Sequence, residues 1–131
     1  MMFVKTKTGP SNIHGVGLFA KEFIPKGTKV WEFTEGFDLV LTKEEVKNLS
    51  EAAREQFLNY AYLSKKSGKY VLCTDDARFF NHQIPSNITC RIPEGSNLIE
   101  ALECFAAKDI QPGEEITNNY EEFDADPSDV I

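Results

Sequence analysis

The sequence of 131 residues lacks any apolar run long enough to cross a membrane, which takes about 18 or more residues. Its first residues, MMFVKTKTGP, also lack the apolar core of a secretory signal peptide. We therefore expect a protein that does not enter a membrane and that stays in the compartment where it is made. The length suits a single domain with a modest core.

An excess of basic residues is also missing. Lysine and arginine total 14 against 21 aspartates and glutamates, so the formal net charge is −7. This balance argues against direct nucleic-acid binding through a broad basic surface. It favours a cationic partner, such as a lysine- or arginine-rich peptide, although plain solubility explains the charge equally well.

Cysteine and histidine are scarce. The cysteines are Cys73, Cys90 and Cys104, with no closely spaced pair of the kind that structural zinc sites use. We therefore predict no metal site, and free thiols in a reducing compartment. His14 and His82 lie far apart in sequence and adjoin no cysteine in a recognised motif, which argues against a histidine-based acid–base pair and against a cysteine nucleophile.

Short apolar or alternating segments predict β-strands over residues 3–7, 29–33, 70–73, 98–107 and 115–117. Glycine and proline signals predict turns at 9–12, 23–27 and 109–113. We expect Trp31, in the second of these strands, to lie in the core rather than at a ligand.

One segment changes to a helical period. Thr42 and Glu45 form a capping-box pattern, and apolar residues then recur at helical spacing. The pattern predicts one helix from about Lys43 to Asn59. Tyr60 and Tyr62, at its end, either close the core or face a substrate.

The chain also contains an internal echo. The pattern Phe-Ala…Ile…Gly…Val/Ile occurs over residues 19–30 and again over 105–116 at one fixed offset. Each copy reads as strand, proline/glycine turn, strand, which indicates two related β-units rather than a long repeat array. The chain is therefore predicted to be mostly β, with one helix inserted between the two units.

Two short motifs stand out from this pattern. In Gly15-Val16-Gly17 the glycines allow the backbone to approach a ligand closely, and the alternative is a kinked entry into a strand. In residues 78–87 two aromatics give way to Asn81-His82 and then to Pro-Ser-Asn, so a polar, irregular segment follows directly on an apolar one. The alternative there is a simple surface turn.

Three pieces of the chain, in order, resemble the SET-domain family of protein lysine methyltransferases: 15–19 (GVGLF), 78–82 (RFFNH) and 113–120 (GEEITNNY). The resemblance runs from about Phe3 to Phe123, and small stand-alone SET proteins of bacteria and large viruses look most similar. It implies a mostly β, SET-domain (β-clip-like) fold of small curled sheets with an inserted helix and a C-terminal pseudoknot. Residues 1–123 would form this one domain.

The same resemblance places a helical insert at about 42–62 and leaves an acidic C-terminal tail over residues 124–131. We expect the acidic stretch 121–131 to fray except near Phe123. It also implies S-adenosylmethionine as the cofactor. The backbone of the early glycine motif lines the cofactor pocket in the family, which here means Gly15, Val16 and Gly17. Asn81 would hold the methionine part of the cofactor, and His82 would contribute near the adenine, mainly through its backbone.

Tyr120 matches the family's catalytic tyrosine and is also expected to contact the cofactor; the alternative is a strand-end aromatic that packs on the core. Phe123 is expected to cover the adenine or the lysine channel. The resemblance implies a lysine-bearing tail of a basic protein as substrate, and homodimerisation is one way in which so small a domain would complete its substrate groove. We expect a cytoplasmic protein if it is bacterial, and a nuclear one, including a host nucleus, if it acts on histones.

The sequence departs from the family pattern at Gln83, Ser86 and Asn119. Cys90 stands at about the position where relatives carry the aromatic residue that limits methyl number, so no degree of methylation is predicted. These departures keep an alternative open, a non-catalytic peptide-binding module on the same fold. A third reading is a β-rich domain that binds some other small ligand.

Overall fold

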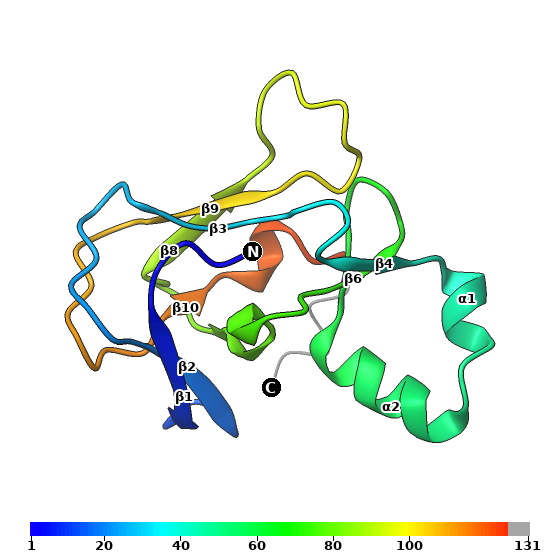
Figure 1. Ribbon diagram of the computed structural model, residues 1–131, viewed down its shortest axis with the longest axis horizontal. Helices are drawn as coiled ribbons and strands as arrows, with labels where there is room; N and C mark the ends of the chain where they lie inside the picture. Colours follow the sequence, from blue (N-terminus) through cyan, green and yellow to red (C-terminus); the bar gives the residue numbers. More distant parts are fainter. Residues whose placement is uncertain (126–131) are drawn as a thin grey trace.

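The computed structural model describes residues 1–125 and shows a mostly β chain arranged as small sheets around one core (Figure 1). The predicted fold class, small sheets with a helical insert, is confirmed in this respect. Within residues 1–125 no helix is both long enough and apolar enough to span a bilayer.

The strands are β1 Thr6–Pro10, β2 Val16–Ala20, β3 Lys29–Glu32, β4 Leu39–Leu41, β5 Tyr62–Leu63, β6 Tyr70–Leu72, β7 Asn81–His82, β8 Ile88–Arg91, β9 Glu103–Ala106 and β10 Thr117–Asn118. The α-helices are α1 Lys43–Lys47 and α2 Glu51–Tyr60, and two 3₁₀-helices are η1 Asp76–Phe79 and η2 Tyr120–Glu122.

Three of the sheets are antiparallel: the hairpin β1–β2, the sheet β3–β9–β8 and the sheet β4–β6–β5. The remaining pair is parallel, with Thr117 of β10 opposite Asn81 of β7 and Asn118 opposite His82. In Figure 1 the β1–β2 hairpin and the two α-helices lie on opposite sides of the molecule, and β10 lies on the side of the hairpin. The parallel pair places the C-terminal segment beside residues 81–82, and the pseudoknot stays a prediction.

The single helix predicted over residues 43–59 is wrong, because the structure has two helices there. Thr42 and Glu45 do form the capping box that begins α1. The side chain of Ser50 then caps a new helix, α2, by accepting a backbone N–H of its first turn. The Arg54 guanidinium donates to backbone carbonyls at the end of α1 and in the break. A local capping residue therefore interrupts a continuous apolar spacing.

Several strand boundaries also differ from the prediction. Residues 9 and 10, predicted as part of a turn, end β1 and pair with β2, and the strand predicted over 3–7 begins only at Thr6. The turn itself falls at residues 11–15, where Gly15 has a φ of +46°. The long strand predicted over 98–107 is reduced to β9. The unpredicted strands β4, β5, β7 and β8 have two to four residues each, too few to show a period.

The internal echo corresponds to two β-units that pair with each other reciprocally. Ile24 and Ile110 exchange both backbone hydrogen bonds, at 2.9 and 2.8 Å, and both side chains are fully buried. Ala20 N–H donates to the Glu114 carbonyl at 3.0 Å, and Ala106 N–H donates to the Thr28 carbonyl at 2.9 Å. Equivalent residues are 86 apart, as Ala20 and Ala106 are, so each unit supplies the partners of the other.

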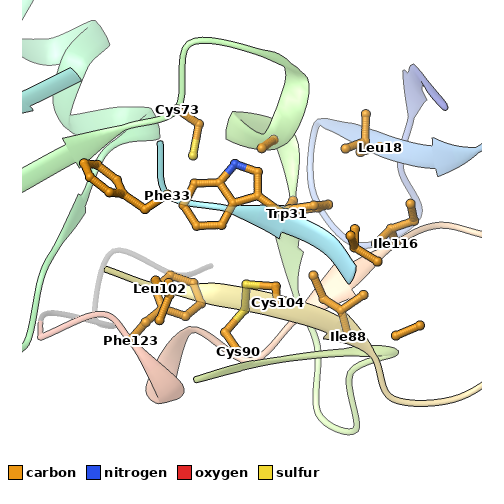
Figure 2. Close-up of a cluster of buried hydrophobic side chains, with 14 of the residues drawn as sticks. Leu18, Trp31, Phe33, Cys73, Ile88, Cys90, Leu102, Cys104, Ile116 and Phe123 are labelled. Carbon is orange, nitrogen blue, oxygen red and sulfur yellow. A yellow bond between two sulfur atoms is a disulfide. The ribbon is translucent and has the colours of Figure 1, made fainter. Parts of the chain in front are cut away.

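The core consists of buried side chains from sheet β3–β9–β8 and from the segments that surround this sheet (Figure 2). Trp31 of β3 is only 2% exposed, and Figure 2 shows its indole between Cys73 and the pair Cys90–Cys104. Phe123 of the C-terminal segment packs in the same cluster. The core therefore holds the C-terminal segment in place beside β3.

The prediction of free thiols is wrong for two of the three cysteines. Cys90 and Cys104 form a disulfide and face each other directly across β8 and β9. The pairing depends on the register of β8, a strand that the sequence pattern did not predict. Cys73 is free and buried, and burial raises the pKa of its thiol far above the ordinary value. Its thiolate is therefore scarce at neutral pH.

The C-terminal segment continues past η2 as an ordered contact. Asp124, only 6% exposed, pairs with Ser64, and Ala125 N–H donates to the Leu63 carbonyl at 2.7 Å. The first two residues of the predicted tail, which directly follow Phe123, are therefore packed against β5. Residues 126–131, the rest of that tail, lie outside the described residues.

Candidate active site

A cavity of about 330 Å³ lies where distant parts of the chain meet. Its walls come from the loop before β2, from η1 and β7, from the end of α2 with β5, and from β10 with η2. Trp31 of β3 and Cys104 of β9 close it toward the core. Its volume is at the lower end of the range of about 300–1,000 Å³ for small-molecule sites.

The structure brings most of the predicted site residues to this cavity. The residues among them that line it are Gly15, Val16, Asn81, His82, Tyr120 and Phe123. Gly17 does not line it. The first, middle and last of the three sequence motifs thus meet at one cavity, while the roles predicted for the individual residues stay predictions.

Tyr120 begins η2 directly beyond β10. Its hydroxyl donates a hydrogen bond of 2.5 Å to the Phe80 carbonyl, and its backbone N–H donates to His82 Nδ1 at 3.0 Å. Burial, helped by the negative charge of Asp124 and by Cys73, raises the pKa of Tyr120 to about 12. The hydroxyl is therefore protonated and fixed in direction at neutral pH.

His82 makes contacts within the site through its ring, and its backbone forms part of β7. Nδ1 accepts from the Tyr120 backbone, and the two rings pack edge to face with centroids 5.3 Å apart. The imidazole thus orients the start of η2.

Within residues 1–125 no group of three or more His, Cys, Asp or Glu side chains is placed to hold a metal ion.

Asn81 holds the glycine motif against β7. Its Nδ2 lies 3.0 Å from the His14 carbonyl, 3.3 Å from the Val16 carbonyl and 2.9 Å from a Glu115 carboxylate oxygen. The amide hydrogens are therefore used inside the protein, and the side chain fixes the loop that carries Gly15 and Val16.

The two glycines of the motif are required for different reasons. Gly15, with its φ of +46°, has a left-handed backbone and open space around it. Gly17 has no such φ, but a Cβ there would lie 2.5 Å from a Glu115 carboxylate oxygen. Its missing side chain leaves room for a residue of this chain.

Aromatic rings form the opposite wall. Phe123, 8% exposed, packs edge to face on Tyr62 at 4.9 Å between centroids and tilts against Tyr120 at 5.8 Å. Tyr60, at the end of α2, packs edge to face on Phe79 at 5.6 Å. The cavity is therefore largely aromatic on this side. Burial also raises the pKa of Tyr62 well above its ordinary value.

Buried polar atoms without a hydrogen-bond partner within the described residues are Trp31 Nε1, Tyr62 Oη and Asn118 Oδ1. All three residues line the cavity. Buried polar groups in proteins are nearly always paired, so three unpaired polar atoms belong to residues around one cavity.

The protein-family model described as "SET domain" matches residues 15–121. The chain belongs to the SET-domain family. This confirms the resemblance carried by the residues and the order of the three sequence motifs.

Curated relatives in the SET family include the histone-lysine N-methyltransferase set9 of Emericella nidulans, 32% identical over 83% of this chain and 16% of its own length. The H3 lysine-4 specific histone-lysine N-methyltransferase of Schizosaccharomyces pombe is 31% identical over 86% of this chain and 12% of its own. The mouse histone-lysine N-methyltransferase SETMAR is 32% identical over 81% of this chain and 37% of its own. The chain thus spans well under half the length of each of these relatives.

Solved structures are similar over nearly the whole chain. A humanized mutant of the Chaetomium thermophilum Polycomb Repressive Complex 2, bound to an inhibitor, has a TM-score of 0.67 and 28% identity, covering 92% of this chain and 15% of that one. A candidate histone methyltransferase of Plasmodium falciparum has a TM-score of 0.63 and 20% identity, covering 91% of this chain and 95% of that one. The second likeness shows the SET fold alone.

Sequence reasoning missed some residues of this SET-domain site. Trp31, expected only in the core, is both buried and part of the cavity wall. Tyr60 and Tyr62, left open between core and substrate, both line the cavity. Asn118 was not singled out, although a polar residue at a buried strand position two residues before Tyr120 is a signal that could have found it.

Proposed function

We propose that this SET domain transfers a methyl group from S-adenosylmethionine to the side-chain amine of a lysine in a basic protein. The observation that carries the proposal is Tyr120, which lines the cavity together with Asn81 and His82 and whose hydroxyl is bonded to the Phe80 carbonyl. The three relatives named above are histone-lysine N-methyltransferases by name, which supports the same reaction.

The residues of the cavity fit such a cofactor. Gly15, Val16, Asn81 and His82 would hold it on the side of the glycine motif, with Phe123 covering it from the aromatic wall. The three unpaired polar atoms of residues around the cavity suit a molecule with amine, carboxylate, hydroxyl and adenine groups. When bound, the cofactor supplies an electrophilic methyl group on a sulfonium ion.

The chain's own contribution is to bind and align a neutral amine. A lysine has a pKa of about 10.4, so deprotonation at pH 7 costs about 4–5 kcal/mol at about 1.4 kcal/mol per pH unit. Aromatic walls disfavour the ammonium form by desolvation. Fixing the amine in line with its target contributes about 7–11 kcal/mol, which outweighs that cost. A dedicated strong base is therefore unnecessary.

Tyr120 suits an orienting role. With a pKa of about 12, about one molecule in ten thousand carries the phenolate at pH 8, so the residue is a poor base. Because its hydrogen is donated to the Phe80 carbonyl, the lone pairs of the hydroxyl oxygen are available to accept from an amine N–H. The hydroxyl would thus aim the amine.

The three residues that depart from the family pattern, Gln83, Ser86 and Asn119, make hydrogen bonds within the protein. The Asn119 side chain caps η2 by accepting a backbone N–H at 3.0 Å. Ser86 Oγ donates to the Ile88 carbonyl at 2.8 Å, where β8 begins. The exposed Gln83 uses its backbone N–H to bond to β10 at 3.1 Å. None of the three disturbs the cavity wall.

The second candidate is a non-catalytic peptide-binding module on the SET fold, which the net charge of −7 favours because it attracts basic tails. The deciding experiment incubates the protein with basic proteins and with cofactor that carries a deuterated methyl group. Mass spectrometry then locates the label. Deuterated methyl-lysine supports the enzyme, whereas calorimetric binding of cofactor and basic peptide without any label supports the module. Binding of neither refutes both.

A further inference from the structure

Glu115 stands behind the cavity rather than in its wall. Its carboxylate accepts hydrogen bonds from Ser11 Oγ, at 2.7 and 2.9 Å to the two oxygens, and from Asn81 Nδ2 at 2.9 Å. In the described part of the chain it has no lysine or arginine partner within ion-pair distance. The charge is therefore balanced by neutral donors, and hydrogen bonds to an ionised acceptor are about twice as strong as neutral ones.

Both of these donors hold the loop that carries the glycine motif. Ser11 Oγ also accepts from the backbone N–H groups of Ile13, at 2.9 Å, and His14, at 3.3 Å. Asn81 Nδ2 holds the same loop from the other side through the carbonyls of His14 and Val16. The Glu115 carboxylate thus holds both side chains, Ser11 and Asn81, that bind the backbone of residues 11–16.

The space for this carboxylate is provided by Gly17. A Cβ there would lie 2.5 Å from Oε2 and 2.8 Å from Cδ of Glu115, and 3.0 Å from Cβ of Ser11. The backbone of Gly17 adopts a φ open to other residues, so the contact with Glu115 rather than backbone strain requires glycine.

We propose that Glu115 is a positioning residue for the cofactor side of the cavity. It fixes the wall formed by Gly15 and Val16 through Ser11 and Asn81, without touching the bound molecule itself. This inference rests on the proposed function, because it names the residue that shapes the cofactor site.

The test is the substitution Glu115→Gln. Glutamine keeps the size but removes the negative charge and one acceptor oxygen, so Ser11 and Asn81, which both lie 2.9 Å from Oε2, must share one neutral oxygen and their hydrogen bonds weaken. We expect calorimetry with S-adenosylmethionine to show binding weakened by about 10- to 100-fold. In the protein without cofactor, amide hydrogen exchange over residues 12–16 should become at least about tenfold faster, with the other segments unchanged.

The matched control is Glu114→Gln, which makes the same change of charge at the adjacent residue. The Glu114 carboxylate accepts from Gln111 N–H and from Asn87 Nδ2 instead of from the loop. We expect cofactor affinity and exchange over residues 12–16 to stay within about twofold of the unsubstituted protein. If Glu115→Gln does not fold, Ser11→Ala removes one of the two donors and should give a smaller shift of the same sign.

A double substitution tests the packing. Gly17→Ala should weaken cofactor binding in the protein with Glu115 and have a smaller further effect in combination with Glu115→Ala, which removes the two closest contacts and leaves the one with Ser11 Cβ. Unchanged affinity and unchanged exchange in Glu115→Gln would overturn the positioning role and leave the proposed function standing. If the unsubstituted protein does not bind the cofactor, the proposed function fails, and loop exchange alone then decides whether Glu115 holds the loop.

Discussion

The substitution Tyr120→Phe removes a single oxygen and keeps the ring that packs against His82 and Phe123. The lost group is the donor to the Phe80 carbonyl, and Phe80 is only 6% exposed. Leaving that carbonyl unpaired should lower the free energy of unfolding by about 1–3 kcal/mol. If the hydroxyl aims the amine, turnover should fall by about 10²- to 10³-fold, the size of effect seen when one preorganised hydrogen-bonding group is removed.

Three measurements separate these effects. Methyl transfer measured by mass spectrometry gives turnover, calorimetry gives cofactor affinity, and thermal unfolding gives stability. We expect turnover to fall while the affinity for S-adenosylmethionine changes by less than about threefold, since no new charge or cavity-wall gap is created. The control is Tyr70→Phe, because Tyr70 of β6 packs edge to face on Phe57 and does not line the cavity.

Turnover equal to that of the unsubstituted protein would refute the aiming role of Tyr120. A loss of cofactor affinity as large as the loss of turnover would also refute it, because the hydroxyl would then act in binding. An equal loss of turnover in Tyr70→Phe would show that the tyrosine effect is one of stability.

Further expectations follow from the same structure. The folded-state pKa of about 12 for Tyr120 lies above the unfolded value of about 10, so its stabilisation is complete below pH 10 and is lost as the pH rises toward 12. The loss should reach about 2–3 kcal/mol, measured as the difference between the protein and Tyr120→Phe in denaturant unfolding across that range; identical pH profiles would contradict it. In unfolded, unreduced protein a thiol reagent should detect only Cys73, and reduction should add Cys90 and Cys104; three thiols before reduction would exclude the disulfide. Ser50→Ala should cost about 1 kcal/mol by removing the cap of α2, measured by thermal unfolding, and an unchanged midpoint would show that the cap contributes nothing.

The sequence could predict features that lie within a few neighbouring residues. The capping box at Thr42 marked the start of α1 correctly, because both partners lie in one turn. The three motifs with Gly15, Asn81 and Tyr120 indicated the SET family, because each motif is a short linear pattern. The proline/glycine turns of the echo were likewise visible, since Gly27 and Gly113 have a φ of +88° and +86°.

Features that depend on distant partners could not be predicted. The disulfide requires the register between β8 and β9, which places Cys90 opposite Cys104. The parallel pair β7–β10 joins segments that show no period of their own. The need for glycine at position 17 arises from Glu115, far along the chain. The residues next to position 17 do not reveal this contact, so the sequence suggested that the glycine makes room for a ligand. In each case the physical cause is a tertiary contact.

The reciprocal pairing of the two β-units has a consequence for synthesis on the ribosome. At about 5–20 residues per second, the partners of Ala20 and Ile24 emerge about 4–19 seconds after those residues do. Until then the first unit presents open backbone edges to other nascent chains, the kind of surface that chaperones shield. The cavity, whose last lining residues Phe123 and Asp124 directly follow η2, can be completed only when almost the whole domain has left the exit tunnel.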